Sequence, residues 1–209
     1  MREFGTRLLA CGRVTLAFHT REPPALPGAS TRHVDLADAQ SLRDCLRDCR
    51  PTRIVYMTPT LAETAPMTHN FVDAATECCG AVLKHIVWVS EGDVGDRFRE
   101  RLREKYQPVF QAVARLMASG LPVTRLEPAA FFQNLRRFYG LDDFVASGGA
   151  EFATGVDAEA PTGWIDARDI AEAVVVLLES SDLQPWLGRH AHLVGSVSPS
   201  INQSVNQSV

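Results

Sequence analysis

The chain has 209 residues, 45% of them apolar, which is enough to bury the core of one domain of ordinary size. Its formal net charge is -4, with Arg and Lys interleaved among Asp and Glu, so no basic surface is available for nucleic acid or an anionic membrane. The longest apolar run, 173–178, is far short of the roughly 20 residues that cross a bilayer. The 5 cysteines include no C-x-x-C and are odd in number, which argues against a disulfide framework. We therefore expect a soluble protein of the cytoplasm, with no nucleic-acid or membrane partner.

Short runs of β-forming residues alternate with segments of helical periodicity along the chain. The expected strands are 13–18, 32–34, 53–57, 85–89 and 123–126. The expected helices are a segment capped by Asp38 and ended by Pro51, then 66–79, then 96–119, and a last one within 164–181 that follows a strand end. This alternation predicts an α/β fold with a doubly wound, mostly parallel sheet and helices on both faces.

Two segments need separate interpretation. The β-branched run 174–176 favours a strand, whereas Asp166 as an N-cap, with Asp169 three residues later, favours a helix, which we predict. Beyond Gly195 the sequence repeats N-Q-S-V and offers no apolar face. We expect a domain over 1–195 and a disordered low-complexity tail over 196–209.

Nothing ahead of Arg13 has the pattern of a first strand followed by a glycine-rich turn. Such a turn presents backbone amides at a helix N-terminus to a pyrophosphate. In the usual strand order 3-2-1-4-5-6 the first strand is central, so its loss leaves about 10 Å between its neighbours. Either these neighbours close up or the core opens.

Ligands of a doubly wound sheet bind beyond the carboxyl ends of the strands, so the residues that follow each strand are the candidates for a site. Arg21 follows the first strand and suits the 2′-phosphate of NADP, where NAD favours an acidic residue. A solvated loop arginine is the alternative. Asp35 and Leu36 follow the second strand, where a carboxylate and an apolar side chain can bracket an adenine ring.

Hydroxyl groups follow the next two strands. Thr58, Pro59 and Thr60 come after the third strand and can line the nicotinamide ribose. Ser90 and Glu91 come after the fourth, where a hydroxyl can face the reactive ring. Together these positions predict a dinucleotide site, with NADP preferred over NAD.

Three segments carry a resemblance to a known family. The run Asp35-Leu36-Ala37-Asp38 with Ser41-Leu42 is similar to D-L-x-D-x-x-S-L, 119–135 to S-G-L-x-x-T-x-L-R-P-x-x-F-x-x-N-L, and 165–171 to I-D-x-R-D-I-A. Over about 8–195 the chain resembles the NmrA-like branch of the atypical short-chain dehydrogenases/reductases, including ergot-alkaloid-type and quinone-reductase-like members. The resemblance implies a Rossmann fold that binds NAD(P), with Pro128, Phe131 and Phe132 near the nicotinamide and Arg168-Asp169 beginning a helix near the substrate.

The absence of the glycine-rich turn should weaken cofactor binding. The chain also departs from the family pattern in other ways. Glu127 stands where such sequences present Arg, and its carboxylate either repels a cofactor phosphate or faces solvent. No Tyr-x-x-x-Lys pair exists, and the adjacent Lys105 and Tyr106 are expected to be solvated and packed, respectively. A substrate-binding lobe that usually follows the equivalent of Gly195 is mostly missing.

The resemblance implies an NAD(P)H-dependent oxidoreductase that reduces a small carbonyl, quinone or imine, with catalytic residues not assigned. Two alternatives remain open, a non-catalytic dinucleotide-binding redox sensor with a protein partner and a truncated inactive reductase. We expect no metal site. Cys45 and Cys49 lie one helical turn apart but lack further ligands nearby, and His190 and His192 alternate on a strand as a solvated or hydrogen-bonded pair.

Overall fold

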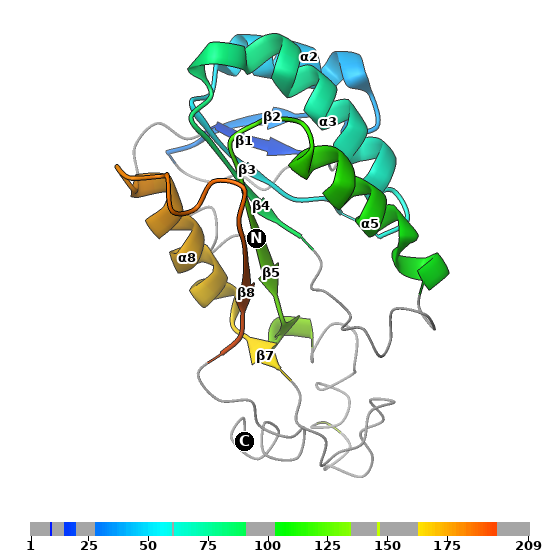
Figure 1. Cartoon of the computed structure of the whole chain (residues 1–209), viewed down its shortest axis with the longest axis vertical. Coiled ribbons are helices and arrows are strands. Elements are labelled where there is room, and N and C mark those ends of the chain that lie inside the picture. Colours follow the sequence, from blue (N-terminus) through cyan, green and yellow to red (C-terminus); the bar gives the residue numbers. More distant parts are fainter. Residues whose placement is uncertain are drawn as a thin grey trace.

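The structure, a computed structural model, describes residues 9, 15–19, 28–59, 61–90, 103–134, 146 and 163–195 (Figure 1). Its strands are β1 (Thr15–Phe18), β2 (Ser30–His33), β3 (Arg53–Tyr56), β4 (His85–Val89), β5 (Val123–Pro128), β6 (Ala130–Phe131), β7 (Trp164–Ile165) and β8 (His190–Leu193). Its helices are α2 (Ala39–Cys49), α3 (Thr64–Cys79), the 3-10 turn η1 (Gly80–Val82), α5 (Arg103–Met117) and α8 (Ala167–Glu179). All strand pairs in these ranges are parallel, so the predicted α/β class is confirmed.

The predicted elements form, with small shifts at their ends. Helix α3 begins two residues earlier than expected, β5 extends two residues further to Pro128, and the pair β6–β7 was not predicted. Asp38 and Asp166 are the N-caps of α2 and α8, and their carboxylates accept hydrogen bonds from Gln40 N and Arg168 N at 2.8 and 2.7 Å. These caps satisfy amides that the first helical turn leaves unpaired, which explains why the segment after Asp166 is a helix despite its β-branched residues.

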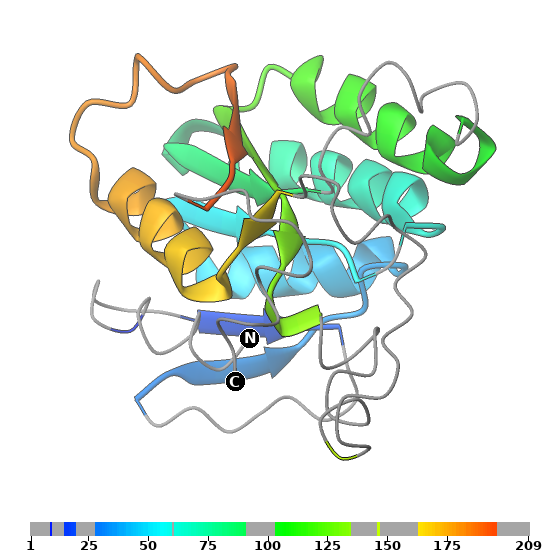
Figure 2. The same ribbon diagram turned by 90° about the horizontal axis from the view of Figure 1, so that it is seen from below.

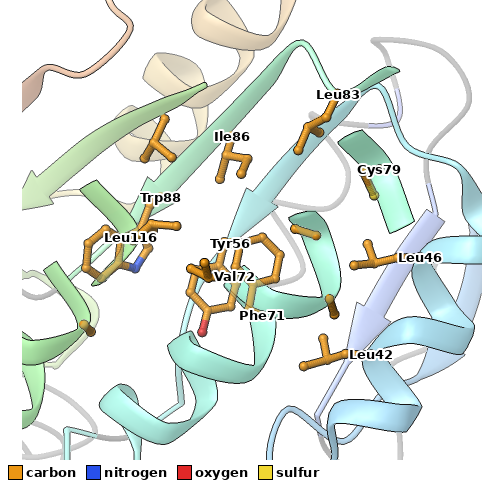
Figure 3. Packing of buried hydrophobic residues seen from close by; sticks show 14 of the residues in the cluster. Leu42, Leu46, Tyr56, Phe71, Val72, Cys79, Leu83, Ile86, Trp88 and Leu116 are labelled. Carbon is orange, nitrogen blue, oxygen red and sulfur yellow. The ribbon is translucent and has the colours of Figure 1, made fainter. Parts of the chain in front are cut away.

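Helices cover both faces of the sheet, as Figure 1 shows: α2, α3 and α5 lie on one face and α8 on the other. On the first face, Ile86 and Trp88 of β4 belong to one apolar cluster with Phe71 of α3 and Leu116 of α5 (Figure 3). On the second face, the alternate residues of β4 pack against α8 through a separate cluster that includes Val87, Val89, Ile170, Val174 and Leu177. Strand β4 is therefore buried on both faces, as expected for a central parallel strand.

The strands divide into separate sheets at the position where the sequence lacks a strand. The pair β1–β2 forms one sheet, and β3-β4-β5-β8 forms another, with β6–β7 as a short third pair. Within the described ranges no strand lies between β1 and β3, and these two strands are not paired with each other. Figure 2 shows β1 and β2 apart from the four-stranded sheet. In the part of the chain that the structure describes, β1 has therefore not closed up onto β3.

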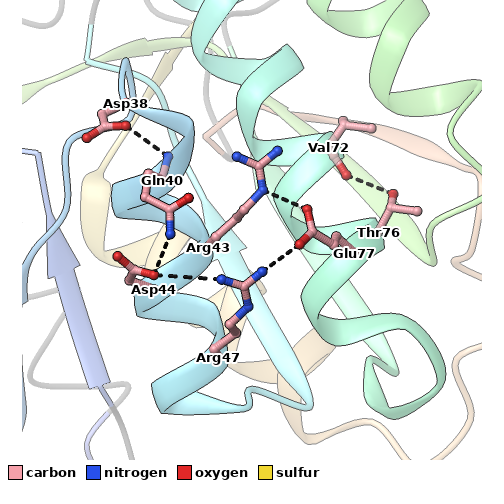
Figure 4. A network of polar contacts seen from close by, with 8 residues as sticks. All are labelled: Asp38, Gln40, Arg43, Asp44, Arg47, Val72, Thr76 and Glu77. Carbon is pink, nitrogen blue, oxygen red and sulfur yellow. Dashed lines mark hydrogen bonds and ion pairs between the residues drawn. The ribbon is translucent and has the colours of Figure 1, made fainter.

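Packing between α2 and α3 joins the two sheets, since α2 follows β2 and α3 follows β3. Leu42 and Leu46 of α2 are buried in the same cluster as Phe71 of α3 (Figure 3). On the exposed side of the same helix pair, Arg43 and Arg47 donate to the carboxylate of Glu77 at 2.6 and 2.5 Å (Figure 4). These ion pairs are exposed and contribute at most about 1 kcal/mol each, so the apolar contact is the main link.

None of the helices in the described ranges has the length and apolar character of a bilayer-spanning segment. The segment 196–209 lies outside the described residues, and so does 96–102 at the start of the expected long helix.

His85 is a buried titratable group at the start of β4. Its Nε2 lies 2.8 Å from Oγ1 of Thr124, whose hydroxyl donates to the backbone oxygen of Trp186 at 2.9 Å. The Thr124 oxygen is therefore placed to accept a hydrogen bond from Nε2–H of a neutral imidazole. Burial lowers the pKa of His85, because the charged imidazolium loses its hydration there.

This gives a prediction for stability against pH. The folded-state pKa of His85 lies below the unfolded value of about 6.5, so below about pH 6.5 the unfolded chain takes up a proton that the folded chain does not. Stability from this group is complete above about pH 6.5 and decreases as the pH falls toward the folded-state pKa. Urea unfolding at about pH 7.5 and at about pH 5.5 measures this effect. Between the two pH values, the free energy of unfolding should decrease more in the parent protein than in His85→Gln. Equal losses in the two proteins would contradict the assignment.

Candidate functional site

The tips of β1 and β2 form the first polar group at the carboxyl ends of the strands. Leu36 N donates to Nδ1 of His19 at 3.0 Å, and this nitrogen lies 3.4 Å from Oδ1 of Asp35. The Asp35 side chain is 47% exposed, and its Oδ1 accepts a hydrogen bond from Ala37 N at 2.8 Å. Asn70 of α3 donates to the backbone oxygens of Leu36 and Ala37 at 3.2 and 3.0 Å. The tip of β2 is thus fixed from two sides, with its carboxylate open to solvent.

The second group follows β3. Oγ1 of Thr58 lies 3.0 Å from Oγ1 of Thr64 in the first turn of α3, and Pro59 is exposed. Behind them, the hydroxyl of Tyr56 contacts Oγ1 of Thr68 at 3.1 Å, and its ring stacks on Phe71 with centroids 4.1 Å apart. Burial raises the pKa of Tyr56, so this phenol is a packing residue and a poor proton donor.

The third group joins the carboxyl ends of β4, β5 and β8. Arg125 donates through Nε to Oγ of Ser90 at 2.8 Å, and its Nη1 forms an ion pair with Oε1 of Glu127. The other carboxylate oxygen, Oε2, lies 2.9 Å from Nδ1 of His192. The Arg125 guanidinium also lies over the Trp88 ring, 5.4 Å from its centroid. One carboxylate therefore contacts a buried cation and a surface imidazole.

The position of Glu127 corrects one expectation. The sequence left open whether this carboxylate repels a cofactor phosphate or faces solvent, and the solvent-facing alternative is wrong, since its side chain is 2% exposed. Burial of a carboxylate is costly unless it is paired. Arg125 supplies that pair because residues two apart on a strand point to the same face.

The fourth group lies on β6, β7 and the start of α8. The Phe132 ring stacks on Trp164 with centroids 5.8 Å apart, while Pro128 is buried and Phe131 half-buried. Gln133 donates to Oδ1 of Asp166 at 3.1 Å and accepts from Ala167 N at 3.2 Å. Hydrogen bonds from the Arg168 guanidinium lower the pKa of Asp166 to about 2, so this N-cap is a carboxylate at neutral pH.

The two cysteines on α2 are half-buried. Sγ of Cys45 lies 3.9 Å from Sγ of Cys49, and burial raises the pKa of Cys45 to about 12, which makes it a poor nucleophile. A hollow of about 310 Å³ beside them is lined by Arg32, His33, Ser41, Asp44, Cys45 and Asp48. In the described part of the chain, no three His, Cys, Asp or Glu side chains are grouped as metal ligands.

The structure describes the positions of most of the predicted site residues. Asp35, Leu36, Thr58, Pro59, Ser90 and Pro128 lie at strand ends, and Phe131 and Phe132 lie on and after β6. Arg21, Thr60 and Glu91 lie outside the described residues. Four residues that the sequence analysis did not assign to a site contact these groups, namely His19, Asn70, Arg125 and His192. The period-two placement of the charged residues Arg125 and Glu127 in a buried strand was a signal for the third group.

No protein-family model matches the chain, and no curated protein is detectably similar in sequence. Solved structures with the same fold do exist. A putative epimerase from Burkholderia cenocepacia superposes with a TM-score of 0.75 at 18% identity, covering 99% of this chain and 76% of that one. An NADPH-dependent quinone oxidoreductase from Escherichia coli, complexed with NADPH, gives 0.72 at 15% identity, covering 99% and 70%.

A third structure is that of NmrA, a negative transcriptional regulator, in complex with NADP. Its TM-score is 0.71 at 17% identity, and the match covers 95% of this chain and 65% of NmrA. At these identities the comparison establishes the fold, which is the one that the family resemblance implied. The chain has the Rossmann-like fold of NmrA and of these epimerase and reductase structures.

The buried ion pair yields a prediction with a surface control. Arg125→Met leaves the Glu127 carboxylate buried without its cation and should lower the free energy of unfolding by about 3–5 kcal/mol. Arg43→Met removes an exposed pair with Glu77 and should cost less than about 1 kcal/mol. Adding Glu127→Gln to Arg125→Met removes the unpaired charge and should restore part of the loss. The measurement is urea unfolding followed by circular dichroism, and equal losses for the two single variants would contradict the buried pair.

Proposed function

We propose that this protein binds a nicotinamide dinucleotide, NADP in preference to NAD, along the carboxyl ends of its parallel strands and reduces a small carbonyl, quinone or imine with it. The observation that carries the proposal is the sequence of polar groups at the ends of β1 to β5 and β8, the edge where open α/β sheets bind ligands. Structures of the same fold with NADPH and with NADP add support.

The residues at the tip of β2 fit the adenosine half of such a cofactor. Asp35 has a half-exposed carboxylate that can accept from an exocyclic amine or a ribose hydroxyl, and the half-buried Leu36 offers an apolar surface beside it. Nδ1 of His19 accepts a hydrogen bond from Leu36 N, so a neutral imidazole carries its own proton on Nε2 and presents a donor there. Arg21, two residues later, is the group that we assign to a 2′-phosphate.

The other half of the cofactor would lie toward Thr58, Ser90 and the β6–β7 pair. Bound there, the reduced nicotinamide supplies a hydride. The chain itself contributes hydroxyl groups of Thr58 and Ser90, and the apolar side chains of Phe131 and Phe132 to exclude water. The sequence has no G-x-x-G-x-x-G turn for the pyrophosphate, so we expect weaker binding than a complete Rossmann site provides.

One observation favours a second candidate, a dinucleotide-dependent regulator without turnover. The sequence holds no Tyr-x-x-x-Lys pair, and one structure of the same fold is a transcriptional regulator in complex with NADP. A panel of quinones, aldehydes and imines separates the two functions. Consumption of NADPH with any of them supports the reductase, whereas saturable binding without consumption supports the regulator.

Cofactor binding is tested by fluorescence titration of the purified chain with NADPH and with NADH. Arg21→Ala should raise the Kd for NADPH about tenfold, since a charge-assisted hydrogen bond contributes about 1.5 kcal/mol, and should leave the Kd for NADH within about twofold. Arg47→Ala, on the exposed face of α2, is the matched control and should change neither value. Absence of saturable binding of both dinucleotides below about 1 mM would refute the proposal.

A further inference from the structure

We propose that His192, held by the buried carboxylate of Glu127, is the acid–base residue of this site and that Glu127 is its positioning residue. This inference rests on the proposed reductase function, because reduction of a carbonyl or imine consumes a proton as well as a hydride. Neither the tyrosine nor the lysine of a Tyr-x-x-x-Lys pair is available to supply it. Tyr106 is half-buried on α5 next to the exposed Lys105, and Tyr56 is buried in the core.

The strand register brings the two residues together at the correct edge. Glu127 of β5 lies opposite His192 of β8, near the carboxyl ends of both strands, and Arg125 lies opposite His190. Partners in a parallel pair point to the same face, so the side chains of all four residues share one face. Ser90, which follows β4, is joined to this face by its hydrogen bond from Arg125. The dyad therefore lies at the edge where the cofactor and substrate are proposed to bind.

Burial differs sharply between the two partners, as an acid–base dyad requires. The Glu127 side chain is 2% exposed and that of His192 is 58% exposed, with 2.9 Å between Oε2 and Nδ1. Arg125 forms an ion pair with Oε1 of the carboxylate. Within the described residues Oε2 has no aligned hydrogen-bond donor, and Nδ1 of the exposed His192 ring lies within hydrogen-bond distance of it.

This arrangement determines the state of the imidazole. A carboxylate only accepts hydrogen bonds, so it selects the tautomer of the His192 imidazole with a proton on Nδ1. Nε2 is then the nitrogen that we assign to proton exchange with a substrate. A His oriented by a carboxylate through Nδ1 is the general arrangement of an acid–base residue, independent of fold.

The proton balance of the step is complete. The substrate carbon accepts the hydride from the reduced nicotinamide, and the π electron pair of the C=O or C=N bond moves to the heteroatom. That atom takes the proton from Nε2 of the His192 imidazolium, and the nicotinamide is left oxidised. The neutral imidazole then regains a proton from the solvent to which it is exposed.

The test has a readout that needs no cofactor. Proton–nitrogen correlation NMR of the full chain reports the histidine tautomer, with His190→Gln and His192→Gln used for assignment. We expect the Nδ1–H tautomer for His192 in the parent protein. In Glu127→Gln the amide oxygen is required by Arg125, so the NH₂ group faces His192 and should convert the ring to the Nε2–H tautomer. An Nε2–H tautomer in the parent overturns the proposal, whatever the activity.

Turnover is the second readout, on the substrate that the panel identifies. His192→Gln should lower kcat about 100-fold or more, the usual contribution of general acid catalysis, and leave the Kd for NADPH within about twofold. Free imidazole should restore part of the activity of His192→Ala. The control His190→Gln changes the neighbouring imidazole, whose ring centroid is 5.5 Å from that of His192, and should keep the parent kcat.

The outcomes separate this inference from the proposed function. If NADPH is consumed and His192→Gln is as active as His190→Gln, the inference is wrong and the reductase function remains. If NADPH binds but no substrate is reduced, the reductase function and the catalytic role of His192 both fail, even where NMR confirms the dyad. If no dinucleotide binds, the proposed function fails first, and the catalytic role fails with it.

Discussion

The in-register parallel pairing of β4, β5 and β8 is the constraint on which the polar edge of this protein depends. The register sets Glu127 opposite His192, and the hydrogen bond from Ser90 N to Leu126 O at 2.9 Å continues the pairing of β4 with β5 to the end of the strand. A slip of one residue in β5 would turn Glu127 to the opposite face. Arg125, two residues away on the same strand, would turn with it, so the ion pair would lie against the apolar cluster under α8, away from Ser90 and His192.

Because the strands form separate sheets, the two parts of that edge differ in how firmly they are held. Strands β1 and β2 have no backbone pairing to β3 in the described ranges, and their link to the rest of the molecule is the packing of α2 on α3 and the bonds of Asn70 to the tip of β2. Side-chain packing is easier to loosen locally than a hydrogen-bonded ladder. A ligand that contacts Asp35 at one end and Ser90 at the other would join the two sheets, and its binding energy would add to their association by mass action.

Local signals explain which parts of this architecture could be predicted from the sequence. The β/α alternation, the Asp38 and Asp166 caps and the edge positions of Asp35, Thr58 and Ser90 depend on residues close together in the chain. The Arg125, Glu127 and His192 contacts depend on the pairing of β5 with β8, which a long stretch of intervening sequence separates. Both strands carry a period-two pattern of polar residues, but periodicity gives the face of each strand and not its neighbour. The β6–β7 pair was also not predicted, because strands of two residues are too short to show a periodic pattern.

The charge arrangement of β5 shows why family resemblance alone does not determine the chemistry of this edge. In the pattern that the chain resembles, an arginine precedes the proline, whereas here a glutamate does and the arginine lies two residues earlier on the same face. The buried pair is neutral as a unit, so it adds no net charge to the core. The strand tip therefore carries a paired arginine and glutamate in place of the single arginine of that pattern.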